Sequence, residues 1–313
     1  MSRHKVRSIG NVRGWILYNK KQCDLTSGDN GVNRLLSAAE EKNISLTVLR
    51  PEQLELIVSR DDRKSILLDG ASTPIPDFII PRMGSNTTYF ALAIIRQLER
   101  LGVYACNSAD AIDIVKDKLH MHQLLAHSNL PTPKTMLVKF PVDIDIVKKE
   151  IGFPVIIKNI SGTEGAGIYL CESESKFVDL MDLIHSNNAK ANIILQEFIA
   201  TSRGKDLRVF VLGGKVIGCM QRSSTSGFKA NYSLGGQVEH YPLTSEIEWL
   251  ATQTARLVDL DVAGIDLLFD DNGYKICEAN SSPGFKGLEL VVGNNVAEQI
   301  LDYIAVKISG HIA

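Results

Sequence analysis

Two carboxylates and one amide side chain stand in a pair of apolar segments near the end of the chain, where core residues are expected. The segments are VAGIDLLF, which carries Asp266, and YKICEAN, which carries Glu278 and Asn280. A three-residue loop over 271–273, within the turn signal DDNG, would bring Asp266 opposite Glu278. Like charges that face each other across two strands are destabilising, so replacing either carboxylate can raise the melting temperature. Such a pair needs a positive partner: either a divalent cation such as Mg²⁺, which prefers oxygen ligands, or an arginine or lysine.

A glycine-rich loop follows a buried strand in the middle of the chain, and this combination can bind phosphate. The loop SGTEGAG supplies Gly162, Gly165 and Gly167, whose backbone N–H groups can approach a phosphate closely. Lys158 ends the strand FPVIIK just before this loop, and Lys118 is a second candidate for a phosphate ligand. No Gly-Lys-Ser/Thr follows, so the loop is not a Walker A motif. The alternatives are a flexible turn and two solvated surface lysines.

Two further stretches point to a nucleotide. QEFI, residues 196–199, ends a strand and could offer the apolar slot and exposed backbone groups that adenine needs, or it could be a simple strand end. Between 203 and 229 the only acid is Asp206, and the basic residues are Arg203, Lys205, Arg208, Lys215, Arg222 and Lys229. This concentration favours a cleft for phosphates and carboxylates, and its alternative is a solvated strand face.

The composition is that of an ordinary globular protein, and it excludes several classes of function. The chain has 313 residues, enough for two domains or for one domain with a lid. Its net charge of −2 gives no reason to expect nucleic acid or a membrane as a partner. Five scattered cysteines without CxxC spacing argue for a reducing compartment and against a zinc site. Because the sequence contains neither a signal peptide nor an apolar run of ~20 residues, we expect a cytoplasmic protein.

In the first third of the chain, predicted strands alternate with predicted helices, and these elements would help to position the side chains above. Strands are expected at 15–19, 45–51, 77–84 and 103–107, and helices at 30–43 and 89–102. The alternation predicts an α/β domain with a parallel sheet over residues 1–107. Ser108 is expected to cap one helix that includes Lys118. Residues 108–199 then form a small α+β unit, and residues 200–313 form another, which opens with a hairpin over a Gly-Gly pair.

In order and spacing, these motifs resemble the ATP-grasp superfamily, and in detail its RimK-like branch, the α-L-glutamate ligase family. The matching stretches include IIPRMGSNTTYFALAIIRQLERLGV, FPVIIKNISGTEGAGI, GKDLRVFVLGGKVIGCMQR, FKANYSLGG and YKICEANSSPGFKGLE. Together the matching stretches run from Trp15 to the last predicted helix. The resemblance implies an α/β protein with the ATP-grasp fold. An N-terminal parallel α/β domain (the pre-ATP-grasp domain) would be followed by a central lid subdomain and a metal-binding subdomain, which sandwich ATP.

The resemblance also implies roles for individual residues. Those implied for ATP are Lys118, Lys158, the lid residues Glu164, Gly165, Ala166 and Gly167, the adenine-binding Glu197, Phe198 and Ile199, the nucleotide ligand Asp206, and the phosphate-binding Lys229, Ala230 and Asn231. Asp266, Glu278 and Asn280 would bind two Mg²⁺ or Mn²⁺ ions. Arg222 and Lys229 would be catalytic groups that stabilise developing negative charge. We expect Arg82, Ser85 and Arg208 to contact the substrates, with both arginines holding carboxylates.

The implied reaction is the ATP-dependent ligation of a carboxylate to an amine through an acyl phosphate, with ADP as product. The added amino acid would be glutamate or a similar acid, the acceptor a peptide, a protein tail or a small metabolite, and the enzyme a homo-oligomer. Two departures leave the acceptor open: Ser233 and Leu234 replace a basic residue that is frequent in the family, and the lid carries Glu164. The alternatives are another ATP-grasp branch, such as D-alanine–D-alanine ligase or glutathione synthetase, and a nucleotide-binding regulator without turnover.

Overall fold

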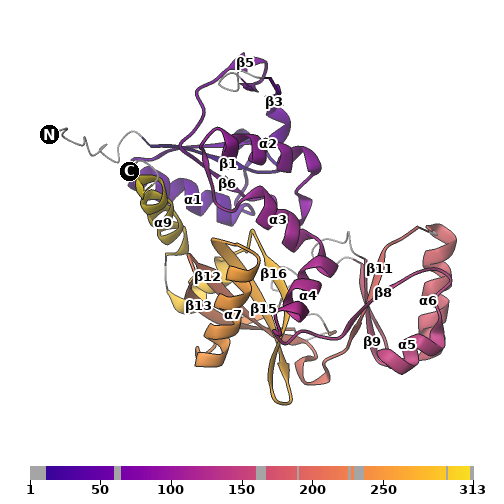
Figure 1. Ribbon diagram of the computed structural model, residues 1–313. Coiled ribbons are helices and arrows are strands. Elements are labelled where there is room, and N and C mark those ends of the chain that lie inside the picture. Colours follow the sequence, from indigo (N-terminus) through magenta and orange to yellow (C-terminus); the bar gives the residue numbers. More distant parts are fainter. Residues whose placement is uncertain are drawn as a thin grey trace.

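The computed structural model describes residues 12–59, 65–159, 167–188, 190–224, 227–228, 236–293 and 295–310. In Figure 1 the first strands and helices form an upper lobe, the C-terminal strands form a lower lobe, and the middle of the chain forms a lateral lobe. The described strands make four sheets. None of the described helices is long and apolar enough to cross a membrane. Short 3₁₀ helices occur at Gln22–Asp24, Pro51–Gln53, Gly84–Asn86 and Ala200–Ser202.

The N-terminal lobe is built on a parallel sheet with strand order β2-β1-β6-β7. Its elements are β1 (Arg13–Leu17), α1 (Asn30–Glu41), β2 (Ser45–Leu49), β6 (Phe78–Pro81), α2 (Tyr89–Arg100) and β7 (Tyr104–Ala105). Strands β1 and β6 are almost entirely buried, as a parallel sheet with covered faces requires, so the predicted alternation is confirmed. The sequence did not predict a small antiparallel sheet of β3 (Leu54–Leu56), β4 (Ile66–Leu68) and β5 (Ala71–Ser72).

The single helix predicted after Ser108 is two helices, α3 (Ala109–Lys116) and α4 (Lys118–His127). Ser108 caps α3 as predicted, because its side chain accepts a hydrogen bond from a backbone N–H of the first turn. Asp117 leaves the helical conformation and caps α4 by accepting from two backbone N–H groups at 3.0 Å each. The break makes Lys118 the first residue of α4, at the helix end that carries partial positive charge.

The lateral lobe contains an antiparallel sheet with strand order β10-β9-β11-β8 (Figure 1). Its elements are β8 (Thr135–Val138), α5 (Ile144–Glu150), β9 (Val155–Asn159), β10 (Ile168–Cys171), α6 (Glu174–Asn187) and β11 (Ile193–Glu197). Apolar side chains of the sheet pack against Val147 of α5 and against Phe177 and Met181 of α6. The sheet and both helices thus share one core, which fixes the ends of β9 and β11.

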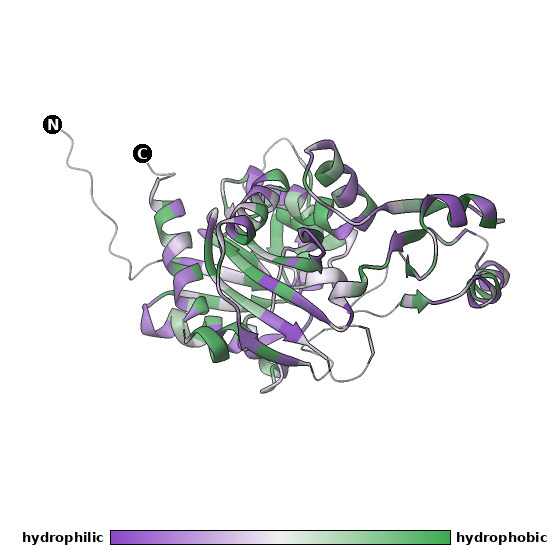
Figure 2. Ribbon diagram, turned by 90° about the horizontal axis from the view of Figure 1, so that it is seen from below, coloured by the Kyte–Doolittle hydropathy of each residue, from purple (hydrophilic) through white to green (hydrophobic). Residues whose placement is uncertain are grey.

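The C-terminal lobe contains an antiparallel sheet with strand order β14-β13-β12-β15-β16. Its elements are β12 (Lys205–Leu212), β13 (Lys215–Ser223), β14 (Gln237–His240), α7 (Ser245–Leu257), β15 (Val262–Asp270), β16 (Gly273–Asn280), α8 (Lys286–Val292) and α9 (Val296–Gly310). The predicted hairpin turns over Gly213 and Gly214, whose φ angles of +56° and +77° favour glycine. Figure 2 shows hydrophilic segments within otherwise hydrophobic strands near the middle of the molecule.

Side chains from different predicted domain ranges pack together in shared hydrophobic cores. Met121 and Leu125 of α4 share a core with the C-terminal sheet, and α9 shares a core with α1 of the N-terminal lobe. The Asn107 side chain joins the same two lobes, because it bonds the backbone N–H and C=O of Val262 and the C=O of Ser281, each at 2.8 Å. The N-terminal and C-terminal lobes therefore form one packed body, to which the lateral sheet is attached.

The hairpin of β15 and β16 brings Asp266 opposite Glu278, as predicted. The predicted three-residue loop is wrong: Asp270 pairs with Gly273, so the loop has two residues, and Leu268 pairs with Lys275. The shorter loop shifts the register by one residue, and a β-bulge beyond Asp266 shifts it back. The shift from the shorter loop and the shift from the β-bulge cancel, so the two carboxylates still face each other.

Candidate active site

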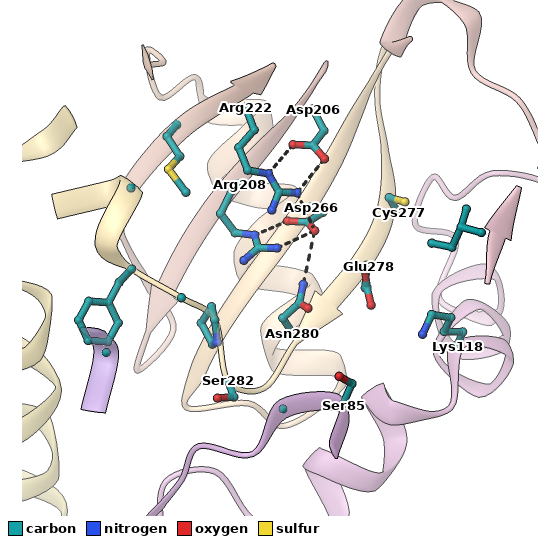
Figure 3. Close-up of a pocket in the computed structure, with 18 of the residues that line it drawn as sticks. Ser85, Lys118, Asp206, Arg208, Arg222, Asp266, Cys277, Glu278, Asn280 and Ser282 are labelled. Atoms are coloured by element: carbon teal, nitrogen blue, oxygen red, sulfur yellow. Dashed lines mark hydrogen bonds and ion pairs between the residues drawn. The ribbon is translucent and has the colours of Figure 1, made fainter. Parts of the chain in front are cut away.

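A cleft of about 750 Å³ lies where the three lobes meet. It brings together thirteen of the residues that the sequence singled out: Arg82, Ser85, Lys118, Lys158, Glu197, Phe198, Ile199, Asp206, Arg208, Arg222, Asp266, Glu278 and Asn280. Figure 3 labels Ser85, Lys118 and the six from Asp206 to Asn280. Gly167 lies apart from them, in a second cavity of about 280 Å³ against α6. The remaining predicted site residues lie outside the described part of the chain: Glu164, Gly165, Ala166, Lys229, Ala230 and Asn231.

Asp266 is held by two arginines, and together with Asp206 they form a buried cluster of four charges (Figure 3). Arg208 donates to both oxygens of Asp266, with Nη2 at 2.8 Å from Oδ2. Arg222 donates to both oxygens of Asp206 at 2.7 Å and also lies 3.0 Å from Oδ2 of Asp266. The positive partner that the sequence required is therefore present within the protein, as arginine side chains.

The neighbouring strands explain why these four side chains meet. Asp206 pairs with Arg222 across β12 and β13, and Arg208 pairs with Asp266 across β12 and β15. In β12, residues two apart share one face of the sheet, so both pairs point into the same cleft. Burial raises the pKa of Asp206, and Arg222 does not fully offset it. At Asp266 the two arginines outweigh the effect of burial and hold the pKa of the carboxyl below its ordinary value.

The oxygen ligands on β15 and β16 are suited to a metal ion that also contacts phosphates. Glu278 is half-buried, points into the cleft and makes no ion pair or hydrogen bond within the described part of the chain. The amide of Asn280 donates to the Gly264 carbonyl at 3.1 Å and lies 3.4 Å from Asp266. The described residues contain no cluster of three His, Cys, Asp or Glu side chains that would hold a metal alone. Two carboxylates and an amide fit Mg²⁺, which usually completes its shell with phosphates and water.

Lys158 is a buried cation in the same cleft. Only 7% of the residue is exposed, and its ammonium group donates to Oε1 of Gln196 at 2.7 Å. Its partners among the described residues are Gln196 and Cys277, neither of them a carboxylate, although a buried charge is costly without a counter-charge. Lys118 projects into the cleft from the start of α4 (Figure 3). The two lysines therefore favour an anionic ligand between β9 and α4.

The end of β11, where the sequence predicts an adenine slot, lines the cleft, and the Glu197 carboxylate there is bound within the protein. Its Oε1 accepts from the backbone N–H of Lys134 at 2.8 Å and from Nζ of Lys275 at 2.6 Å. Burial would raise the pKa of Glu197, but these two donors lower it overall. The carboxylate thus ties the lateral lobe to β16, while Phe198 and Ile199 continue past the strand end and line the cleft.

The N-terminal wall of the cleft carries Arg82. Its guanidinium donates to the carbonyl of Pro283 at 3.0 Å and stacks over the ring of Phe285, with 5.6 Å between guanidinium carbon and ring centroid. Burial lowers the pKa of Arg82 to about 10. Within the described residues no carboxylate pairs with it, which leaves donors for an anion in the cleft. Ser85 is exposed at the rim, in the 3₁₀ helix Gly84–Asn86.

Sequence reasoning gave no role to the side chains of several polar residues of the cleft, although it singled out the stretch QEFI that contains Gln196. His122 on α4 and Gln196 on β11 are 4% and 2% exposed, at positions that an apolar pattern would give to core residues. Asp29 precedes α1, where its carboxylate accepts from the Tyr18 hydroxyl at 2.7 Å and from Lys20 at 2.8 Å. The usable signal was a polar residue in an apolar stripe, which the sequence offers in HMHQLL and ILQEF.

Comparisons with known proteins agree with this architecture. A RimK PreATP-grasp domain matches residues 25–112, and a RimK-like ATP-grasp domain matches residues 115–304. A protein named probable alpha-L-glutamate ligase from Methanococcoides burtonii is 35% identical over 273 residues, which are 87% of this chain and 90% of the relative. One with the same name from Hydrogenovibrio crunogenus is 36% identical over 284 residues, or 89% of this chain and 92% of the relative.

Solved structures share the fold at low sequence identity. The RimK domain protein ATP-grasp from Sphaerobacter thermophilus has a TM-score of 0.71 at 17% identity, covering 93% of this chain and 99% of that one. The D-alanine–D-alanine ligase from Bacillus anthracis has a TM-score of 0.69 at 14% identity, covering 95% and 97%. The ATP-grasp fold predicted from the sequence is thereby confirmed. Since the family models span most of its length and the relatives match almost end to end, the chain belongs to the RimK-like ATP-grasp family.

Proposed function

We propose that this chain, an ATP-dependent ligase of the RimK-like ATP-grasp family, joins a substrate carboxylate to an amine through an acyl phosphate. The observation that carries the proposal is that one cleft holds both a cation for phosphate and oxygen ligands for a metal. Lys158 is a buried cation without a carboxylate partner among the described residues, and it shares the cleft with the oxygen ligands Asp266, Glu278 and Asn280. A nucleotide polyphosphate with its magnesium ion would satisfy both sets of groups.

In the proposed reaction an oxygen of the substrate carboxylate attacks the γ-phosphorus of ATP. The bond to the β-phosphate oxygen breaks, which gives ADP and an acyl phosphate. The amine nitrogen then attacks the acyl carbon, inorganic phosphate leaves, and the nitrogen loses a proton. This chemistry needs no nucleophile from the protein, so the chain contributes position and charge compensation.

The proposed roles follow from where the side chains lie. Lys118 and Lys158 would hold the phosphates, and the backbone of Phe198 and Ile199 would contact adenine, with Asp206 as a further nucleotide ligand. Asp266, Glu278 and Asn280 would bind two Mg²⁺ or Mn²⁺ ions, and bound metal would offset the phosphate charge. Arg222 would add charge stabilisation, together with Lys229. Residues 164–167 are proposed as a lid.

For the substrates, we propose that glutamate or a similar amino acid is added to a peptide, a protein tail or a small carboxylate, because the relatives carry the name probable alpha-L-glutamate ligase. Arg82, on the N-terminal wall of the cleft, would hold a substrate carboxylate near Ser85. The likeness to D-alanine–D-alanine ligase is at 14% identity and supports the fold alone. Homo-oligomerisation, a cytoplasmic location and the subdomain ranges 1–107, 108–199 and 200–313 remain proposals from the sequence.

The test is to supply ATP and Mg²⁺ with pooled amino acids and peptides and to follow phosphate release and product mass. We expect release that depends on both a carboxylate and an amine, and a product heavier by one amino-acid residue. The Glu278→Gln variant should be inactive, because it loses a metal ligand without losing an internal contact. Phosphate release that no amino acid or peptide stimulates would contradict the proposal.

A further inference from the structure

The buried ammonium of Lys158 is held by a neutral side chain where a protein would ordinarily use a carboxylate. Its acceptor is Oε1 of Gln196, 2.7 Å away, and the only other neighbour within bonding range in the described part is Sγ of Cys277, at 3.9 Å. An ammonium group can only donate, so the amide must turn its oxygen toward Lys158. The amide nitrogen of Gln196 must therefore point away from Lys158.

The Gln196 amide nitrogen continues the hydrogen-bond chain into the protein. It donates to Oγ1 of Thr135 at 2.9 Å and to Nε2 of His122 at 3.1 Å. The other ring nitrogen of His122, Nδ1, lies 2.5 Å from Oγ1 of Thr132, whose hydroxyl donates to the Ile276 carbonyl at 3.3 Å. Every donor then has an acceptor only if His122 is neutral and carries its proton on Nδ1.

The surroundings of His122 favour this neutral form. Burial is the largest influence, and the charges of Lys158 and Lys118 add to it, so the pKa of His122 falls to about 3. The imidazole is therefore uncharged at neutral pH. The other members of the chain are an amide, a hydroxyl and a backbone carbonyl, so no group from Gln196 to Ile276 carries a negative charge that could neutralise Lys158.

We propose that Gln196 and His122 are positioning residues, which aim the Lys158 ammonium into the cleft while leaving its charge available to a phosphate. The proposal rests on the proposed function, because it assumes that Lys158 meets ATP. A carboxylate in place of Gln196 would also orient the lysine, but it would form a buried ion pair that competes with the nucleotide. The neutral amide orients Lys158 without that competition.

The test uses the nearly isosteric Gln196→Glu variant and calorimetric titration with a non-hydrolysable ATP analogue and Mg²⁺. We expect the analogue to bind at least about 10-fold more weakly, while the melting temperature without ligand stays the same or rises, because Lys158 gains a partner. The matched control is Gln123→Glu, which makes the same charge change on the exposed side of α4 and should bind like the wild type. A merely structural role for Gln196 predicts that affinity is lost only in proportion to stability.

A second variant keeps the proposal testable if Gln196→Glu does not fold. Gln196→Met removes the acceptor without adding charge, and it should also weaken binding of the analogue. In the wild type, nitrogen NMR of the ring of His122, assigned with a His122→Gln variant, should show the proton on Nδ1. Wild-type affinity in the Glu and Met variants, or a proton on Nε2, would overturn the proposal.

The Lys158→Met variant separates this inference from the proposed function. If Lys158→Met weakens binding and the Gln196 variants do not, Lys158 remains a phosphate ligand and only the positioning role fails. If Lys158→Met binds the analogue like the wild type, both the positioning role and the assignment of Lys158 to the nucleotide fail.

Discussion

Replacing Asp266 by asparagine should destabilise the protein strongly, even before any effect on catalysis is considered. The four charges of the buried cluster sum to zero in the wild type, with one bidentate arginine for each aspartate and a third contact between Arg222 and Asp266. The Asp266→Asn variant would leave a net positive charge there, with Arg208 deprived of its only carboxylate partner among the described residues. Repulsion between Asp266 and Glu278, considered from the sequence alone, predicts the opposite sign.

The magnitude follows from the burial of the groups. Arg208, Arg222 and Asp266 are 8%, 5% and 5% exposed, so water solvates a stranded charge poorly. Opposite charges about 4 Å apart interact by roughly 4 kcal/mol at an effective dielectric constant near 20. Removing one partner of a buried pair costs about 3–5 kcal/mol in free energy of unfolding. For a chain of this size that corresponds to a fall of roughly 5–15 °C in melting temperature.

The assay is thermal unfolding without nucleotide or metal, compared with Glu278→Gln as the matched control. Glu278 is half-buried without a described partner, so its amide variant should lie within about 0.5 kcal/mol of the wild type. Adding Arg208→Met to Asp266→Asn removes the stranded charge and should recover part of the loss, which a double-mutant cycle measures. A stability of Asp266→Asn equal to that of Glu278→Gln would refute the assignment of Asp266 to a buried ion-pair cluster.

Three further predictions concern the ligands and pH. Lys118→Met and Lys158→Met should each weaken binding of a non-hydrolysable ATP analogue by roughly 1.5–3 kcal/mol, measured by calorimetry; unchanged affinity would remove that lysine from the site. His122 has a pKa lowered to about 3 from 6.5, so the unfolded state takes up its proton first as pH falls. Between pH 6.5 and about 3, its contribution should reduce the free energy of unfolding by about 1.4 kcal/mol per pH unit. Urea unfolding of His122→Gln should lack this slope. Ligation should yield ADP and phosphate, with hydroxylamine trapping the acyl phosphate as a hydroxamate; chromatography that finds stoichiometric AMP would rule the mechanism out.

Much of the architecture could be predicted from the sequence because local patterns determine it. The alternation of strands and helices predicted the parallel sheet, Ser108 predicted a helix start, and a Gly-Gly pair predicted the hairpin between β12 and β13. Two carboxylates in apolar strands indicated a functional site, because a charge at a core position is costly without a counter-charge or a ligand. The residues that the sequence singles out by type and spacing come from all three lobes and line one cleft.

Only the tertiary structure identified the charges that balance Asp266. The motifs and the family resemblance favoured a divalent metal beside Asp266 over an arginine, because Arg208 and Arg222 reach Asp266 only through the pairing of β12 with β13 and with β15. It also gave no means of finding the chain of hydrogen bonds from Lys158 through Gln196 to His122, whose members come from three different elements. Periodicity reports which face of an element is buried, whereas the partner of a buried charge depends on strand order and register. Those depend on contacts between residues far apart in the chain, and so the charge balance of the cleft is a property of the fold.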